Sequence, residues 1–194
     1  EWPPSPWRLM RSFIAGAFRL PEGERESALA LLRELNRVNP SYRVPKTTAS
    51  HTRFYGPNME KPDSTTKLLD TFIVFDSDES YIDVSWPVNL DTDLLNRIVC
   101  QISYLGRSES WVFAHTIDQD IEPNIVPDRG GTIRSLRAND FDTLMKTTDE
   151  FRQEGWTLPP SSQWVFYKNL GIANKPKKSK LTHELVFELS GKNL

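Results

Sequence analysis

The proline-rich stretch at residues 2–7, Trp-Pro-Pro-Ser-Pro-Trp, is the feature of this sequence that most constrains its fold. Its prolines fix the backbone, and the pattern that follows them is helical. Ser5 can accept hydrogen bonds from the N–H groups that a first helical turn leaves unpaired. Pro6 suits the first helical position because its φ is already set and it has no N–H to leave unpaired. The stretch therefore predicts a helix that begins at Pro6.

The predicted helix has an apolar face and a cationic face. Its apolar residues recur at three-and-four spacing, and they are Trp7, Met10, Phe13, Ile14, Ala17 and Phe18. The other face carries Arg8, Arg11, Ser12 and Arg19. We expect the apolar face to pack against a core. Arg8 and Arg11 are candidates for contacts with phosphate groups, and an ordinary solvated helix face is the alternative.

Helical and strand-like patterns alternate along the rest of the chain. Helices are predicted at residues 24–38, between Asp91 and Gly106 and between Asn139 and Gly155, and strands at residues 68–75, 81–86, 111–117, 164–167 and 185–189. The polar cluster at residues 76–80 joins the first two strands and predicts a hairpin. The lysine-rich segment at residues 174–180 is expected to be an exposed loop. This order of elements predicts an α+β fold of the ferredoxin-like type, in which a first strand would precede Glu1.

Residues 41–67 break the periodicity and are predicted to form a long loop or a protruding hairpin. Cationic and aromatic side chains alternate within this segment and flank it, and they are Lys46, His51, Arg53, Tyr55 and Lys67. Cations contact phosphates and flat rings stack on unpaired bases, so this mixture suits single-stranded RNA. The alternative is that Phe54 and Tyr55 pin the segment to the core while its basic residues are only solvated.

A predicted turn after the third helix offers another candidate anion site. Arg107 and Ser108 lie there, just before the strand at residues 111–117. Such a turn presents backbone N–H groups to an anion, or it caps itself. The glycines at residues 128–131 lack the lysine spacing of a phosphate-binding loop, so we do not assign a nucleotide site there.

Composition excludes several classes of function. The formal net charge of -2 argues against indiscriminate coating of nucleic acid, although local cationic patches remain able to bind it. Cys100 is the single cysteine, so no disulfide can form within the chain, and none of the histidines belongs to a metal-binding pattern. No apolar run approaches the length of a membrane span. We therefore expect a cytoplasmic protein that uses no metal and no cofactor and does not contact a membrane.

Several stretches of the chain together resemble one protein family. They are Glu1-Trp-Pro-Pro-Ser-Pro-Trp-Arg-Leu-Met-Arg11, His51-Thr-Arg-Phe-Tyr55, Lys67-Leu-Leu-Asp-Thr-Phe72, Tyr104-Leu-Gly-Arg-Ser-Glu-Ser-Trp-Val112 and Leu158-Pro-Pro-Ser-Ser-Gln-Trp164. The family is the CRISPR-associated RAMP protein of type I-U (I-G) systems, which joins a Cas-five-like half to a Cas-six-like half. This chain resembles the N-terminal, Cas-five-like half over essentially its whole length.

The resemblance implies a fold and a domain organisation. RAMP proteins are ferredoxin-like, as RNA-recognition motifs are, and the family has a strand before the Trp-Pro-Pro motif. We expect a ferredoxin-like core at residues 1–120 with a thumb-like loop at about 41–67. An α/β extension at residues 121–194, with strands and one helix, is expected to pack on this core.

The resemblance also implies a function. It predicts a subunit that binds the 5′ handle of a crRNA at one end of a Cascade surveillance complex, beside the backbone and large subunits and near the PAM end of the target DNA. The candidate RNA-binding residues are Arg8, Arg11, Lys46, His51, Arg53, Tyr55, Arg107 and Ser108.

Cleavage of pre-crRNA is expected mainly of the Cas-six-like half. The chain departs from the family at Phe54, where a second histidine is expected, so an acid–base pair is not assumed in this motif. The alternative function is a metal-independent endoribonuclease in which His51 is the general base and Tyr55 or Lys67 assists.

Overall fold

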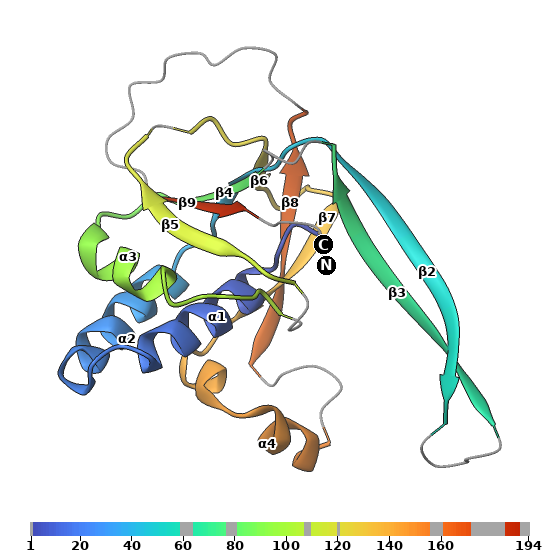
Figure 1. The fold of residues 1–194 in the computed structure, drawn as a ribbon. Coiled ribbons are helices and arrows are strands. Elements are labelled where there is room, and N and C mark those ends of the chain that lie inside the picture. Colours follow the sequence, from blue (N-terminus) through green and yellow to red (C-terminus); the bar gives the residue numbers. More distant parts are fainter. Residues whose placement is uncertain are drawn as a thin grey trace.

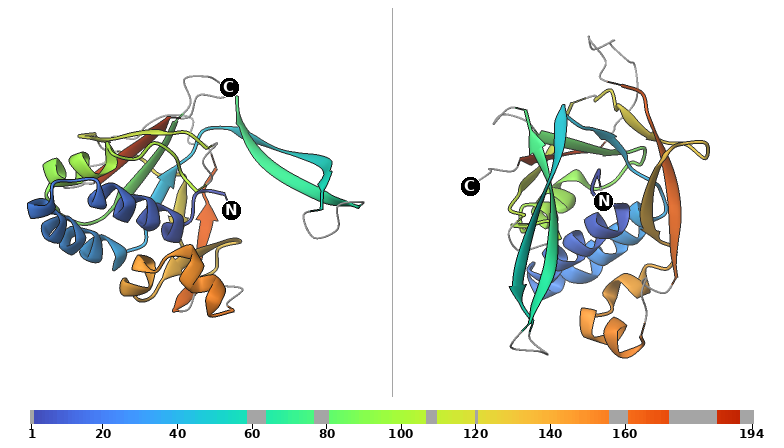
Figure 2. Two further views of the ribbon diagram at one scale, coloured as in Figure 1. Left: turned by 60° about the horizontal axis from the view of Figure 1, so that its bottom comes forward. Right: turned by 90° about the vertical axis from the view of Figure 1, so that its right-hand side faces the viewer.

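The computed structural model describes residues 2–58, 64–76, 81–106, 110–119, 121–155 and 161–171, and the backbone alone of residues 185–190. Helices pack against a curled antiparallel sheet of seven strands to form the body of the molecule (Figure 1). A two-stranded ribbon, which we call the arm, projects from this body (Figures 1 and 2). The predicted α+β class is confirmed.

The helices and strands have the following bounds. The helices are α1 (Pro6–Phe18), α2 (Glu22–Asn36), α3 (Thr92–Val99) and α4 (Thr148–Gln153), and the 3-10 helix η1 (Asp142–Met145) precedes α4. The strands of the body are β1 (Ser41–Arg43), β4 (Tyr81–Trp86), β5 (Phe113–Ile117), β6 (Ile125–Pro127), β7 (Ile133–Ala138), β8 (Ser162–Asn169) and β9 (Leu185–Ser190). The arm consists of β2 (Thr47–Pro57) and β3 (Thr65–Phe75).

The strands of the main sheet lie in the order β5-β9-β4-β1-β6-β8-β7. β9 pairs in antiparallel fashion with β4 on one side and with β5 on the other. β4 and β5 are therefore parallel to each other, and the chain between them contains α3. This arrangement is a split β-α-β unit, because a third strand separates the two parallel strands.

Helix α1 begins as its sequence predicts. The Ser5 hydroxyl accepts a hydrogen bond from the Arg8 N–H at 3.3 Å, and Pro6 is the first helical residue. Leu9, Phe13 and Ala17 of its inner face are buried in the core. Glycine is required at Gly16, because an added Cβ would lie 2.5 Å from the Ile98 carbonyl oxygen of α3.

The arm is a regular ribbon joined to the body at one end. Its strands pair over their full length, from Thr47 opposite Phe75 to Pro57 opposite Thr65. The Trp2 and Phe75 rings are in T-shaped contact, with ring centroids 5.9 Å apart. The opening proline-rich stretch therefore both starts α1 and supports the base of the arm.

One predicted hairpin is wrong, and a different one is present. The strand predicted at residues 68–75 belongs to β3 and pairs with β2, whereas the strand at 81–86 is β4 of the main sheet. β3 and β4 belong to different sheets and do not pair with each other, so they form no hairpin. Of the two alternatives for residues 41–67, the protruding hairpin is confirmed, although it extends to Phe75.

Two predicted helices have different bounds. The third helix ends at Val99 instead of Gly106, although Ile102 and Leu105 beyond it are still buried. The helix predicted between Asn139 and Gly155 is divided into η1 and α4. The division arises because Thr147 and Glu150 form a capping box that starts a new helix.

The remaining predicted elements have mixed outcomes. The helix at 24–38 and the strands at 111–117, 164–167 and 185–189 are confirmed as α2, β5, β8 and β9. β1, β6 and β7 were not predicted. The lysine-rich segment at residues 174–180 lies outside the described residues. Strands from both sides of the boundary predicted after residue 120 contribute to one sheet.

Candidate nucleic-acid interface

The register of the arm places four candidate residues on one face of the ribbon. Side chains alternate between the two faces of a strand, so His51, Arg53 and Tyr55 of β2 share a face. Lys67 of β3 lies directly opposite Tyr55 and therefore belongs to the same face. We call these four residues the cationic face of the arm.

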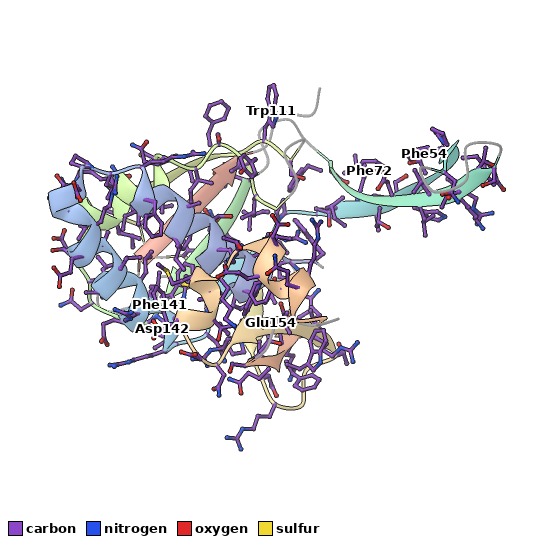
Figure 3. All side chains as sticks on the ribbon, turned by 90° about the horizontal axis from the view of Figure 1, so that it is seen from below. Phe54, Phe72, Trp111, Phe141, Asp142 and Glu154 are labelled. Carbon is purple, nitrogen blue, oxygen red and sulfur yellow. The ribbon has the colours of Figure 1, made fainter. Side chains whose placement is uncertain are left out.

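The cationic face is open to solvent. All four side chains are exposed, and Tyr55 is 67% exposed. Arg53 is opposite Leu69 and has no ion pair with a residue that the structure describes. The alternative that Phe54 and Tyr55 pin this segment to the core is wrong, because both rings are exposed. Figure 3 shows Phe54 on the projecting ribbon.

The opposite face of the arm carries a group of exposed apolar side chains, which the sequence patterns did not reveal. They are Phe54, Leu68, Phe72 and Val74, and the polar pair Thr52 and Asp70 shares this face with them. Figure 3 shows Phe54 and Phe72 on the arm, away from the body. That these residues share one face can be recognised from the sequence only when β2 and β3 are known to pair. We call this set the apolar face of the arm.

Lys46 and Arg8 lie outside the cationic face. The Lys46 ammonium group forms a 3.1 Å ion pair with Asp76, at the base of the arm. The Arg8 side chain runs alongside Gly106, where an added Cβ would lie 3.0 Å from Arg8 Nε. Arg107 and Ser108 follow Gly106 in the chain and lie outside the described residues.

Arg11 makes contacts within the body, which add a structural role to its predicted contact with RNA. Its guanidinium donates hydrogen bonds to the carbonyl oxygens of Leu144, at 2.7 Å, and Lys146. The guanidinium also lies over the Phe151 ring, 5.9 Å from the centroid. Burial lowers the pKa of Arg11. The side chain thus joins α1 to η1 and to Lys146 just after it, through one of its guanidinium nitrogens.

The candidate catalytic residues His51, Tyr55 and Lys67 do not all lie close together on the arm. Tyr55 lies four residue steps beyond His51 on an extended strand, which is about 14 Å along the ribbon. Tyr55 and Lys67 are cross-strand neighbours, but His51 is opposite Thr71. A general base must be within hydrogen-bonding reach of the proton that it removes. A single scissile phosphate would therefore not reach His51 and the Tyr55–Lys67 pair together.

Two further observations concern the described residues as a whole. Within them, no cluster of three or more histidine, cysteine, aspartate or glutamate side chains is placed to hold a metal ion. No helix in this part of the chain is both long and apolar enough to cross a membrane.

Comparisons with protein-family models, with curated proteins and with solved structures find no match to this chain.

Proposed function

We propose that this chain binds single-stranded RNA through the cationic face of the arm, as the crRNA 5′-handle-binding and assembly subunit of a type I-U (I-G) Cascade complex. The observation that carries the proposal is the common orientation of His51, Arg53, Tyr55 and Lys67 on an exposed, projecting ribbon. The sequence motifs support the family in this proposal, and the register of β2 and β3 supports the choice of surface.

The chemistry of the cationic face suits an RNA strand. Arg53 and Lys67 offer N–H donors to phosphate oxygens, and arginine can do so in a bidentate manner. The exposed ring of Tyr55 offers a surface on which an unpaired base can stack. A ribbon that projects from the body can follow a single strand without excluding its phosphates from water.

The topology of the body supports a ferredoxin-like RAMP fold. In such a fold two split β-α-β units share one antiparallel sheet. The β4-α3-β5 unit is one of them, with β9 in the place between its two strands. β1 pairs with the other edge of β4 and follows α1 and α2 in the chain, as the end of the second unit would.

The apolar face of the arm supports the assembly role. A two-stranded ribbon by itself is only marginally stable in water, and packing against another element stabilises it. Phe54, Leu68, Phe72 and Val74 provide an apolar stripe for such packing. We assign this stripe to contacts with the backbone subunit of the complex, while the opposite face contacts RNA. The large subunit and target DNA near the PAM end remain further partners of the proposed complex.

RNA cleavage by this chain is the weaker candidate, because His51 and the Tyr55–Lys67 pair are separated along the ribbon. Incubation of repeat RNA with the purified chain in EDTA distinguishes the two functions. Intact RNA is expected. A cleaved product with a 2′,3′-cyclic phosphate that disappears in His51→Ala would instead establish the endoribonuclease.

The RNA-binding proposal is tested with Arg53→Ala. We expect weaker binding of a labelled handle RNA in fluorescence anisotropy, with the salt dependence log Kd against log salt reduced by about 0.7 for one lost phosphate contact. Arg37→Ala is the matched control, because Arg37 is exposed on α2 and pairs with Glu34 in the same helix. Equal affinities for Arg53→Ala and Arg37→Ala would exclude the cationic face as the RNA-binding surface.

A further inference from the structure

We propose that the outer face of β7 and β8 is a second surface for single-stranded RNA, on which Trp164 and Phe166 stack against bases. This surface lies in the body, on different strands from the arm, and none of its residues belongs to the cationic face. The proposal therefore extends beyond the proposed function and can stand or fail independently of it.

The alternation of β8 separates an inner from an outer face. Tyr167 points inward, is fully buried and contacts the Tyr42 ring at a centroid distance of 5.5 Å. Trp164, Phe166 and Lys168 have the opposite orientation, because side chains alternate along a strand. Figure 2 shows α1 and α2 on the inner side of this part of the sheet.

The two outer rings are accessible, although a tryptophan and a phenylalanine would ordinarily be largely covered. Trp164 is 38% exposed and Phe166 is 41% exposed. They lie two residues apart, which is about 7 Å along the strand. Rings that are aligned along one strand of an open sheet can each stack against an unpaired base of the same RNA strand.

Cations adjoin both rings. Arg134 of β7 is directly opposite Phe166 in the register, and its guanidinium carbon lies 4.3 Å from the centroid of the Trp164 ring. This cation–π contact orients the planar guanidinium while its N–H groups remain available to a phosphate. Lys168 extends the row beyond Phe166. Neither cation has an ion pair with another residue in the described part of the chain.

Charge distinguishes RNA from an apolar protein partner as the occupant. The chain carries a formal net charge of -2, so exposed cations beside two aromatic rings are a local feature and do not reflect a basic protein. The turn between β6 and β7 contains one acidic residue, Asp128, whose carboxylate accepts a hydrogen bond from the Gly130 N–H. Aromatic rings interleaved with unpaired cations match the alternating bases and phosphates of a single strand.

The test uses a labelled, unstructured RNA of about 12 nucleotides that lacks the handle sequence, since single-stranded sites commonly span a length of this order. Fluorescence anisotropy is measured for Phe166→Ala and Trp164→Ala, each in the otherwise unchanged chain and together with Arg53→Ala. We expect each ring deletion to weaken binding by roughly tenfold in both backgrounds. Phe166→Tyr should retain the affinity because it keeps the ring.

The matched control is Phe113→Ala, since Phe113 is a 66% exposed phenyl ring on another strand of the same sheet. It should leave the affinity unchanged. Arg134→Gln leaves both rings in place, and it should weaken binding and reduce its salt dependence. The RNA affinity of Arg134→Gln still tests the surface if a ring deletion lowers the melting temperature.

Several outcomes would overturn the inference. Unchanged RNA affinity in Phe166→Ala, Trp164→Ala and Arg134→Gln would exclude the surface, and so would loss of self-association in these variants without loss of RNA binding. DNA of the same sequence should bind more weakly, and equal or tighter binding would remove the assignment to RNA. Sensitivity to Arg53→Ala alone would leave the proposed function standing without the second surface.

Discussion

The body and the arm contain strands of comparable regularity, but they differ in what those strands pack against. In β4 of the body every residue after Tyr81 is buried, whereas in β3 of the arm none is. The body is therefore stabilised by burial of apolar side chains, while the arm depends on interstrand hydrogen bonds and cross-strand contacts. The body therefore holds the buried side chains of these two strands, and the arm leaves most of its side chains open to solvent.

The same substitution in the two regions gives the largest predicted contrast. Phe13 of α1 is 1% exposed and contacts the Trp86 ring, whereas Phe72 of the arm is 46% exposed. Phe13→Ala should reduce the free energy of unfolding by about 3–5 kcal/mol, because it leaves a cavity in the core. Phe72→Ala should change it by about 0.5 kcal/mol. Urea unfolding monitored by circular dichroism measures both.

A similar loss of unfolding free energy in both variants would contradict this expectation. It would mean that the apolar face of the arm is covered in the isolated protein, for example by self-association. The melting temperature of Phe72→Ala should then depend on protein concentration, as it does when association stabilises the folded state. With the arm free, no such dependence is expected.

Buried hydrogen bonds give the next largest contrast. Asn124 is 7% exposed, and its side-chain amide both accepts from the Val44 N–H at 2.9 Å and donates to the Val44 carbonyl at 2.8 Å. Asn124→Ala should destabilise the body by about 2 kcal/mol, since buried polar groups of Val44 lose their partners. Asn169→Ala is the control, because Asn169 is exposed and caps only the Gly171 N–H.

Equal unfolding free energies for Asn124→Ala and the wild type would show that water replaces the amide at Val44. The junction where the chain passes from β1 into the arm would then be as solvated as the arm itself. RNA binding by the cationic face should be unaffected in either Asn variant, because neither residue belongs to the arm.

The parts of the fold that follow from local chemistry were predictable. Ser5 and Pro6 identify the start of α1 without any distant partner, and the apolar spacing of α2 identifies its buried face. The hairpin error has a different origin. Residues 68–75 have strand character whichever neighbour they pair with, so the choice between β2 and β4 depends on contacts that the local pattern does not contain.

The candidate site shows the same division between local and distant information. The sequence identified His51, Arg53, Tyr55 and Lys67 as a set, but only the β2–β3 register places them on one face and the apolar residues on the other. The structural contact of Arg11 was not predictable, because the carbonyl oxygens that it contacts belong to residues more than 130 positions away. An arginine on a solvent-exposed helix face and an arginine that contacts distant carbonyl groups occur in the same local sequence pattern.

Helix α4 gives the smallest predicted effect and tests an element intermediate between the two regions. It belongs to the body, but none of its residues is buried. Its start depends on the Glu150 carboxylate, which accepts hydrogen bonds from the Thr147 backbone N–H and hydroxyl. These bonds lower the pKa of Glu150 below its ordinary value of 4.5. The stabilisation is thus complete above pH 4.5 and is lost as the pH falls through the lower pKa of the folded state.

Protection of the Phe151 and Glu154 amides from hydrogen exchange should therefore fall below pH 4.5, after correction for the intrinsic exchange rate, while the amides of the main sheet keep theirs. Glu150→Gln removes the charge, so its α4 protection should not show this pH dependence. If the sheet amides lose protection together with α4, the helix unfolds as one unit with the core in spite of its exposure. The boundary between burial-dependent and locally stabilised structure would then lie at the base of the arm, where Trp2 contacts Phe75, and nowhere within the body.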